Sequence, residues 1–247
     1  MSSKLGRRRF LERTFRGVTG MIAAVGVTEN ALADRVRRET PSRGARGLLA
    51  GAATVDITPE VLPVITSGSF LEATATVVND RLFARGLVLD DGSTRLTVVI
   101  VDSLMIPREM LDEVKRLASA ATGIREDHML IAANHTHTAP SAMGALGSRC
   151  DEAYAAFLPA RIVECIGQAD ANRVPAEVGW GSIADSEDTN CRVWIRRPDR
   201  IGGDPFGEPT VRAMMHPGYQ NPDYIGPCGP EDPELSLLAV RTSTGKP

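Results

Sequence analysis

From residue 48 onward, apolar and polar positions fall into short runs that predict β-strands. The run LLAGAATVDITPE is apolar at its start and ends in a Thr-Pro turn. Two β-rich runs follow within residues 81–103, and the turn sequence DDG between them predicts a β-hairpin. The second run, LTVVIVD, is apolar almost throughout, which is typical of a strand covered on both faces.

The pattern then changes to a helical period. Apolar residues between Pro107 and Gly123 recur at helical spacing and predict an amphipathic helix of about four turns, at Met110, Leu111, Val114, Leu117, Ala118 and Ala121. The following sequence HMLIAAN predicts another short, buried strand. Strand, helix and strand at this spacing indicate a βαβ unit with parallel strands.

The C-terminal half mixes one long helix with strands and loops. Residues 151–171 are predicted to be helical, with Pro159 either kinking the helix or marking a fresh start. Residues 175–187 predict a strand with an alternating face, whereas Pro and Gly are too dense in residues 196–234 for regular structure. The final LSLLAVR predicts a strand that should lead into a partner strand, so we expect a truncated chain.

These elements predict an α/β fold: a mixed β-sheet with a βαβ unit and flanking helices, forming an incomplete catalytic domain over residues 48–247. The 247 residues, 43% of them apolar, suit one soluble globular domain or at most two small ones.

Residues 1–33 carry the three parts of an export signal in order. Arg7 and Arg8 precede an apolar pair in a twin-arginine pattern, a short apolar stretch follows, and Ala-Leu-Ala ends at residue 33. A disordered basic tail or a short amphipathic helix is the alternative. We therefore expect a twin-arginine signal peptide read by the Tat export machinery, a flexible lead-in at 34–47, and a protein exported to the periplasm or the extracellular space.

Charge and cysteine spacing exclude some functions. Removal of the signal takes six of 28 basic and two of 31 acidic side chains, leaving 22 and 29, and a net charge of −7 gives no reason to expect nucleic-acid binding. The four cysteines show no C-x-x-C spacing, which argues against a zinc ribbon. Export permits a Cys150–Cys191 or a Cys191–Cys228 disulfide, although buried free thiols, Cys165 included, are the favoured interpretation.

The sequence LIAANHTHTAP holds two of only four histidines. In an extended segment His135 and His137 would point to the same side, at the C-terminal end of a buried strand, where open α/β sheets bind ligands. Asp102 closes the neighbouring strand and is predicted at the same rim, as a catalytic residue. Neutral imidazoles are good Zn²⁺ ligands, so the pair predicts part of a zinc site with an open position for water. Hydrogen-bonded loop histidines are the alternative.

Five segments carry a resemblance to a known family: ATVDITP, RGLVLDDG, VIVDS before a helix, NHTHTAP and GPEDPELSLLAVR. Residues 51–247 resemble the N-terminal part of the neutral (non-lysosomal) ceramidase family, especially its bacterial members. The resemblance implies a zinc amidase that hydrolyses the N-acyl bond of ceramide. It also implies that His135 is a zinc ligand and that His137 is a catalytic residue.

The chain departs from the family pattern in several places. The family motif ends Ser-Gly-Pro where this chain has Thr-Ala-Pro. The resemblance implies a catalytic arginine from an Asn-Arg element, and Arg192 matches it only with a shift of one residue, so Arg192 either takes this role or the role is lost. The resemblance assigns the other zinc ligands, a histidine, a glutamate and a tyrosine, to sequence beyond Pro247, so we expect this fragment to be inactive alone. His216 is a weak substitute ligand, and His128 is interpreted as a capping or surface residue.

We therefore expect an exported, zinc-dependent hydrolase acting on ceramide or a related lipid amide, with possible peripheral membrane contact. Two alternatives stay open. One is an exported metal hydrolase for another amide or ester, because fold and metal do not fix the substrate. The other is a non-catalytic domain that binds lipid or a partner.

Overall fold

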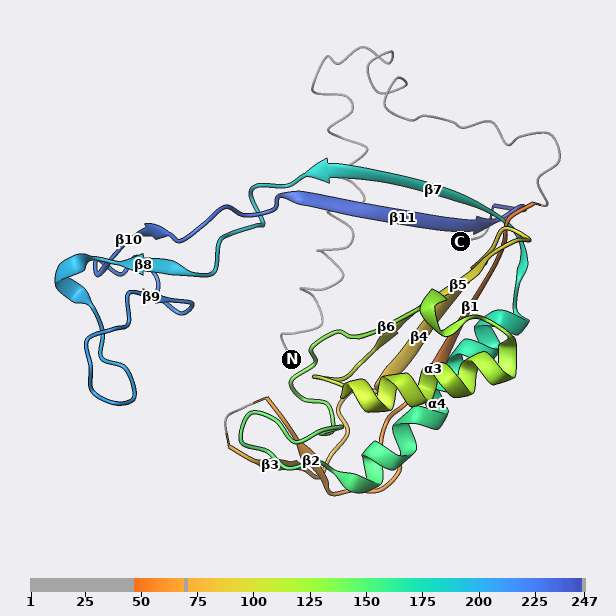
Figure 1. Ribbon diagram of the computed structural model, residues 1–247, viewed down its shortest axis with the longest axis horizontal. Coiled ribbons are helices and arrows are strands. Elements are labelled where there is room, and N and C mark those ends of the chain that lie inside the picture. Colours follow the sequence, from red (N-terminus) through yellow and green to blue (C-terminus); the bar gives the residue numbers. More distant parts are fainter. Residues whose placement is uncertain (1–46, 69–70, 246–247) are drawn as a thin grey trace, which may run out of the picture. The chain divides into compact units, whose positions relative to one another are not determined.

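The computed structural model describes residues 47–68 and 71–245. The expected signal peptide, and the lead-in up to residue 46, lie outside the described residues. The described chain contains a six-stranded sheet in the order β11-β7-β1-β4-β5-β6, together with helices α3 and α4 (Figure 1). The predicted α/β class with a mixed sheet is confirmed.

The pairing of the strands confirms both predicted supersecondary units. β1 pairs antiparallel with β4, and β4 pairs antiparallel with β5 as the hairpin. β5 and β6 are parallel, with α3 between them in sequence, as a βαβ unit requires. The strands of the sheet are β1 (Leu49–Asp56), β4 (Phe83–Asp90), β5 (Arg95–Val101), β6 (Met129–Ala133), β7 (Val174–Ala184) and β11 (Glu234–Thr242).

Helix α3 (Arg108–Thr122) begins and ends at the residues the sequence indicates. Pro107 is its N-cap, and Gly123 ends it in the left-handed conformation, with φ of 73° and its N–H donated to the Ser119 carbonyl over 2.8 Å. A short 3₁₀ turn, η1 (Glu126–His128), then leads into β6.

Helix α4 (Glu152–Ala171) runs through Pro159 without a break, so this proline does not mark a fresh start. Its neighbours Leu158 and Ile162 are fully buried, and we attribute the tolerance of the proline to this packing. The Asp151 side chain caps the helix by accepting the Tyr154 N–H at 3.0 Å. None of the helices in the described residues combines the length and apolar content needed to cross a membrane.

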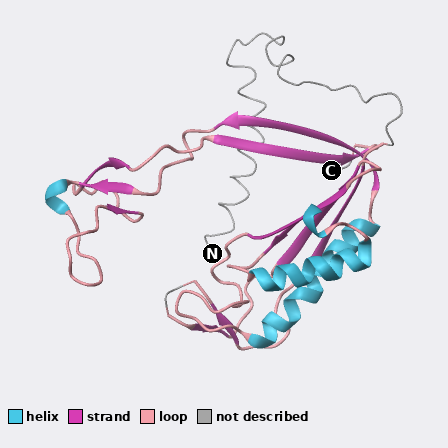
Figure 2. Cartoon of the chain, in the orientation of Figure 1, coloured by secondary structure: helices cyan, strands magenta, loops and turns pink. Residues whose placement is uncertain are grey.

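The core lies on one face of the sheet only. α3 and α4 pack together against the same face of β1, β4 and β5 (Figure 2). On β5, Thr97, Val99 and Val101 face this core and are buried, whereas Leu96 is 40% and Ile100 38% exposed. The expectation that this strand is covered on both faces is therefore wrong, because both helices lie on the same side.

The segment with dense Pro and Gly is more regular than expected. It contains a three-stranded antiparallel sheet in the order β10-β8-β9, formed by β8 (Trp194–Arg196), β9 (Ala213–Met214) and β10 (Tyr224–Pro227), and the 3₁₀ turn η2 (Pro198–Arg200). The prediction of irregular structure is wrong here, because the strands are only two to four residues long and β10 includes Gly226 and Pro227, with a register shift between Tyr224 and Gly226.

β11 also finds its partner in an unexpected place. It pairs antiparallel with β7, from Glu234 opposite Ala184 to Thr242 opposite Ala176. The expected partner strand thus lies upstream in the sequence. β7 in turn joins β1 through two residue pairs, at Leu49 and Ala50.

Gly51 of β1 allows the closest approach between the sheet and α4. A Cβ at this position would lie 2.2 Å from the Ala169 carbonyl oxygen and 2.7 Å from the Arg173 nitrogen. Because backbone atoms cannot move aside, we predict that Gly51→Ala lowers the free energy of unfolding by about 1–3 kcal/mol or more. Urea denaturation of the full chain measures it.

Gly167 of α4 is the matched control, because a Cβ there meets no atom within 4 Å. We predict that Gly167→Ala raises the free energy of unfolding by about 0.5–1 kcal/mol, since alanine favours the helix. Equal effects of the two substitutions would contradict the close packing of β1 on α4.

Candidate functional site

The C-terminal ends of β5 and β6 form one rim of the sheet. The parallel register places Val101 opposite Ala133, and the two chains stay hydrogen-bonded beyond that point. The Asn134 N–H donates to the Val101 carbonyl at 3.1 Å, and the Thr136 N–H donates to the Ser103 carbonyl at 3.0 Å. The His-Thr-His segment is therefore held beside the chain that leaves β5.

The two histidine rings converge, but not for the reason that the sequence suggested. β6 ends at Ala133, and His135 has a φ of 63°, so the segment is not extended. Positive φ is uncommon outside glycine, although histidine adopts it more readily than most residues. The turn brings the ring centroids of His135 and His137 to 4.7 Å, with the rings edge to face at 81°.

Each ring is oriented by a backbone carbonyl. Nδ1 of His135 lies 3.1 Å from the Leu104 oxygen, and Nδ1 of His137 lies 2.8 Å from the Gly68 oxygen. A carbonyl only accepts hydrogen bonds, so both Nδ1 atoms carry the proton, and the neutral rings keep a lone pair on Nε2. Both histidines are exposed to solvent. Metal-binding histidines typically show this pattern of carbonyl support.

A second small sheet supplies the Gly68 carbonyl. β2 (Val64–Thr66) and β3 (Ala73–Ala75) pair antiparallel on either side of the segment that contains this glycine. Several contacts tie this sheet and its loop to the chain after the histidines. The Ser141 N–H donates to the Ile65 carbonyl at 2.8 Å, and Arg149 pairs with Glu72 at 2.7 Å.

Hydrogen bonds from Arg149 lower the pKa of the Glu72 carboxyl to about 2, so this ion pair stays formed in mildly acidic solution.

Gly68 cannot be replaced without moving a catalytic candidate. Its φ is 114°, and a Cβ there would lie 2.7 Å from Nδ1 of His137. The glycine therefore provides both the left-handed backbone and the space in which the ring lies.

Asp102 lies at the predicted rim, but its carboxylate is already occupied. It is 8% exposed and accepts hydrogen bonds from the Phe83 N–H at 2.8 Å, the Arg85 guanidinium at 2.9 Å and the Asn134 amide at 2.6 Å. Asn134 directly precedes His135. The arrangement makes Asp102 a group that positions the histidine segment.

Arg192 and His216 lie beside each other. Arg192 lies between β7 and β8, and its Nη2 is 3.4 Å from Nε2 of His216. In the described part of the chain, no hydrogen bond or ion pair joins either residue to His135 or His137. The expected role of Arg192 at the rim therefore stays a prediction.

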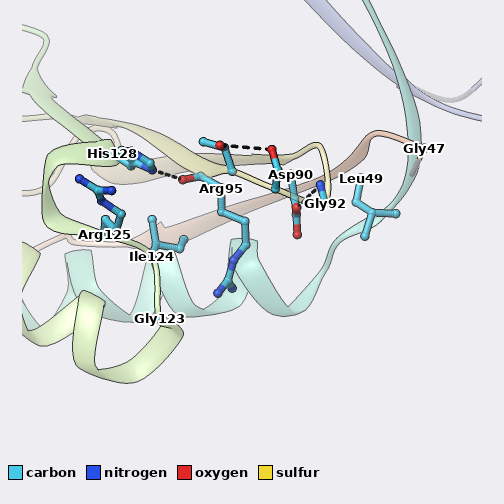
Figure 3. Close-up of a pocket in the computed structure, with 11 residues that line it drawn as sticks. Gly47, Leu49, Asp90, Gly92, Arg95, Gly123, Ile124, Arg125 and His128 are labelled. Atoms are coloured by element: carbon cyan, nitrogen blue, oxygen red, sulfur yellow. Dashed lines mark hydrogen bonds between the residues drawn. The ribbon is translucent and has the colours of Figure 1, made fainter. Parts of the chain in front are cut away.

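A cavity lies at the opposite end of the β5–β6 pair, where both strands begin. It has a volume of about 640 Å³ and is lined by the turn between β4 and β5 and by Arg125 and His128 (Figure 3). His128 Nδ1 lies 3.0 Å from the Arg95 oxygen, an interaction drawn in Figure 3. Arg95 and Arg125 are paired with Asp170 and Asp127, so these cationic groups are already neutralised.

A second cavity, of about 420 Å³, lies beside Asp56 and Arg161. Neither cavity is lined by His135 or His137.

The chemistry of the histidine pair is compatible with a metal ion. Two unprotonated Nε2 atoms on adjacent rings are donors that zinc prefers. Within residues 47–68 and 71–245, no group of three His, Cys, Asp or Glu side chains is placed to hold a metal ion.

Sequence reasoning missed the residues that orient the rings. Leu104 and Gly68 orient the rings through backbone oxygens, and a pattern of side chains does not predict contacts of this kind. Asn134 stands directly before the first histidine, and its adjacency to the pair was the one signal available.

Comparisons with known proteins support the fold. No protein-family model matches the sequence, and no curated protein matches it. Neutral ceramidase from Pseudomonas aeruginosa is similar in structure, with a TM-score of 0.56 and 22% identity over 81% of this chain. A structure described as ceramidase complexed with C2 is similar with a TM-score of 0.55, also at 22% identity over 81% of this chain. The chain spans 30% of the length of each. This likeness establishes a ceramidase-like fold.

We predict that Gly68→Ala displaces the His137 ring, because a Cβ would overlap Nδ1 and strain the backbone. The measurement is the ¹⁵N NMR spectrum of the imidazoles, in which wild-type His137 should be the Nδ1–H tautomer. The variant should lose that single tautomer, while His128 stays unchanged.

Gly144→Ala is the control for this substitution. A Cβ there would lie an ordinary 3.6 Å from the Ser148 oxygen. An unchanged His137 tautomer in Gly68→Ala would show that the glycine does not position the ring.

Proposed function

We propose that the chain is part of an exported, zinc-dependent amidohydrolase that cleaves the N-acyl bond of ceramide or a related lipid amide. The observation that carries the proposal is the convergence of His135 and His137, with rings 4.7 Å apart and both Nδ1 atoms held by carbonyls. A fold like that of a neutral ceramidase supports it.

In this proposal His135 binds the zinc ion through Nε2. Its Nδ1–H bond to the Leu104 oxygen fixes the ring and keeps the lone pair on the outer nitrogen. By family resemblance, the remaining ligands would be a histidine, a glutamate and a tyrosine.

His137 is the proposed proton carrier. A bound zinc ion supplies a Lewis acid for the amide carbonyl and eases deprotonation of water. With its Nδ1–H bonded to Gly68, His137 can accept a proton on Nε2 from the attacking water and return it to the leaving amine nitrogen. The products are a carboxylic acid and an amine, as hydrolysis requires.

Asp102 takes no direct part in the chemistry in this proposal. Its carboxylate accepts a hydrogen bond from Asn134 and so holds this residue beside β5. The guanidinium of Arg85, 2.9 Å from the carboxylate, balances the negative charge of Asp102. Asp102 is thus a positioning residue. Arg192 receives no step in the reaction, because its contact is with His216.

We predict that zinc added to the full chain shifts the ¹⁵N resonance of His135 Nε2 and leaves Nδ1 little changed, because Nδ1 is bonded to Leu104. His135→Ala should abolish the response. His128→Ala is the matched control and should retain the zinc-dependent shift of His135, since His128 lies at the opposite end of the β5–β6 pair. Equal responses from all four histidines would indicate nonspecific binding and contradict the zinc site.

Substrate class is tested in the complete gene product that contains these residues. We predict that it releases fatty acid from a fluorescent ceramide and that His137→Gln lowers kcat by about 10²-fold or more, because a general acid–base group is lost. Zinc content should stay the same in that variant.

Simple amide and ester substrates separate this proposal from its alternatives. Cleavage of a small ester with ceramide untouched would favour another metal hydrolase. Zinc-free protein that binds lipid vesicles without any turnover would favour the non-catalytic domain.

A further inference from the structure

The sheet β10-β8-β9 has no hydrophobic core of its own. Within the described residues 172–245, no side chain is buried. Its large apolar residues stay partly in water, with Trp194 37%, Ile195 36% and Met214 40% exposed. A small sheet that buries so little apolar surface is marginally stable unless something else holds its strands together.

Two cysteines flank this sheet, and each has one atom within hydrogen-bonding distance of the same carbonyl oxygen. The Cys228 N–H donates to the Val193 oxygen at 2.8 Å, and the Cys191 Sγ lies 3.3 Å from the same oxygen. The Cys191 sulfur and the Cys228 nitrogen are therefore at most about 6 Å apart, the sum of the two hydrogen-bond lengths.

The strand register explains this proximity. Pro227 of β10 is paired with Trp194 of β8, so Cys228 follows at the next position and faces Val193. Cys191 stands two residues before Val193, and positions two apart lie diagonally on the same side of a ladder. Arg192 forms a bend, which turns Cys191 back toward the sheet.

We propose that Cys191 and Cys228 form a disulfide that joins the start of β8 to the end of β10 when the protein meets a disulfide oxidant. The bond would close the segment 192–227, which includes β9, into a loop. Restricting that segment in its unfolded state stabilises the sheet in place of a hydrophobic core. This inference is independent of the proposed zinc chemistry.

The chemistry is thiol–disulfide exchange with a small disulfide such as oxidised glutathione. The thiolate of one cysteine attacks a glutathione sulfur, and one reduced glutathione leaves. The second cysteine then attacks the mixed disulfide and releases the other. The protein loses two electrons and two protons, and the glutathione disulfide gains them.

The other two cysteines are poorly placed to compete. Cys165 is fully buried in the core, and its Sγ lies 3.4 Å from the Ala84 oxygen. Burial raises the pKa of both the Cys165 and the Cys150 thiols, with nearby Glu152 and Asp151 adding to the effect at Cys150. A smaller thiolate fraction slows exchange at both sites.

The test uses the full chain, purified with all four thiols reduced. It is incubated with oxidised and reduced glutathione, blocked with N-ethylmaleimide, digested and mapped by mass spectrometry. We expect one intramolecular link, between Cys191 and Cys228, with Cys150 and Cys165 still reduced. Trypsin cleavage after Arg200 or Arg212 should leave fragments that separate only after reduction.

Matched serine variants complete the experiment. Cys150→Ser should form the same link, whereas Cys228→Ser should not. In the wild type, trypsin should cut the segment 192–227 about tenfold more slowly in the oxidised than in the reduced protein. Reduced thiols at both positions, separate glutathione adducts, a Cys150–Cys191 link or dimers joined through Cys228 would each overturn the proposal. The wild-type map decides the question even if a variant fails to fold.

Discussion

The parallel pairing of β5 with β6 is the constraint on which the histidine pair depends. It brings Val101 opposite Ala133 and continues past both strands through the Asn134 and Thr136 amides. Parallel strands need a crossover, and α3 supplies it while covering part of the sheet. The same pairing lets Asp102 hold Asn134 at 2.6 Å. Without it, the turn that follows β6 would have no fixed position.

Burial is distributed unevenly along the chain, and this separates two regions of different character. The helices α3 and α4 seal one face of β1, β4 and β5, whereas Leu130 on β6 is 59% exposed on the open face. Beyond α4, long antiparallel pairing between β7 and β11 replaces a core. Backbone hydrogen bonds set the register there, and they leave apolar side chains such as Trp180, 67% exposed, in water.

The chemistry of the rim follows from which atoms orient the rings. Two carbonyl oxygens, from Leu104 and Gly68, favour the Nδ1–H tautomer of His135 and His137, which leaves the lone pair of each neutral ring on Nε2. Asp102 acts on this arrangement indirectly, because it accepts a hydrogen bond from Asn134, the residue before His135. In this chain the histidine pair follows β6 at the C-terminal ends of the parallel strands β5 and β6, the usual position for ligands in open α/β sheets.

The sequence by itself determined the local elements. The helical period between Pro107 and Gly123, the DDG hairpin and the existence of a strand before the histidines were interpreted correctly, because capping, turn chemistry and periodicity act over a few residues. The prediction that this strand is buried is wrong, because one face of β6 is open and exposes Leu130. Tertiary structure decided the rest. Packing around Leu158 and Ile162 accompanies a helix that continues through Pro159, and the pairing partner of β11 is β7, far upstream. The positive φ of His135 brings the rings of His135 and His137 together, and the carbonyl of Gly68, 69 residues away, orients the His137 ring. Such contacts depend on chain positions that no local pattern encodes.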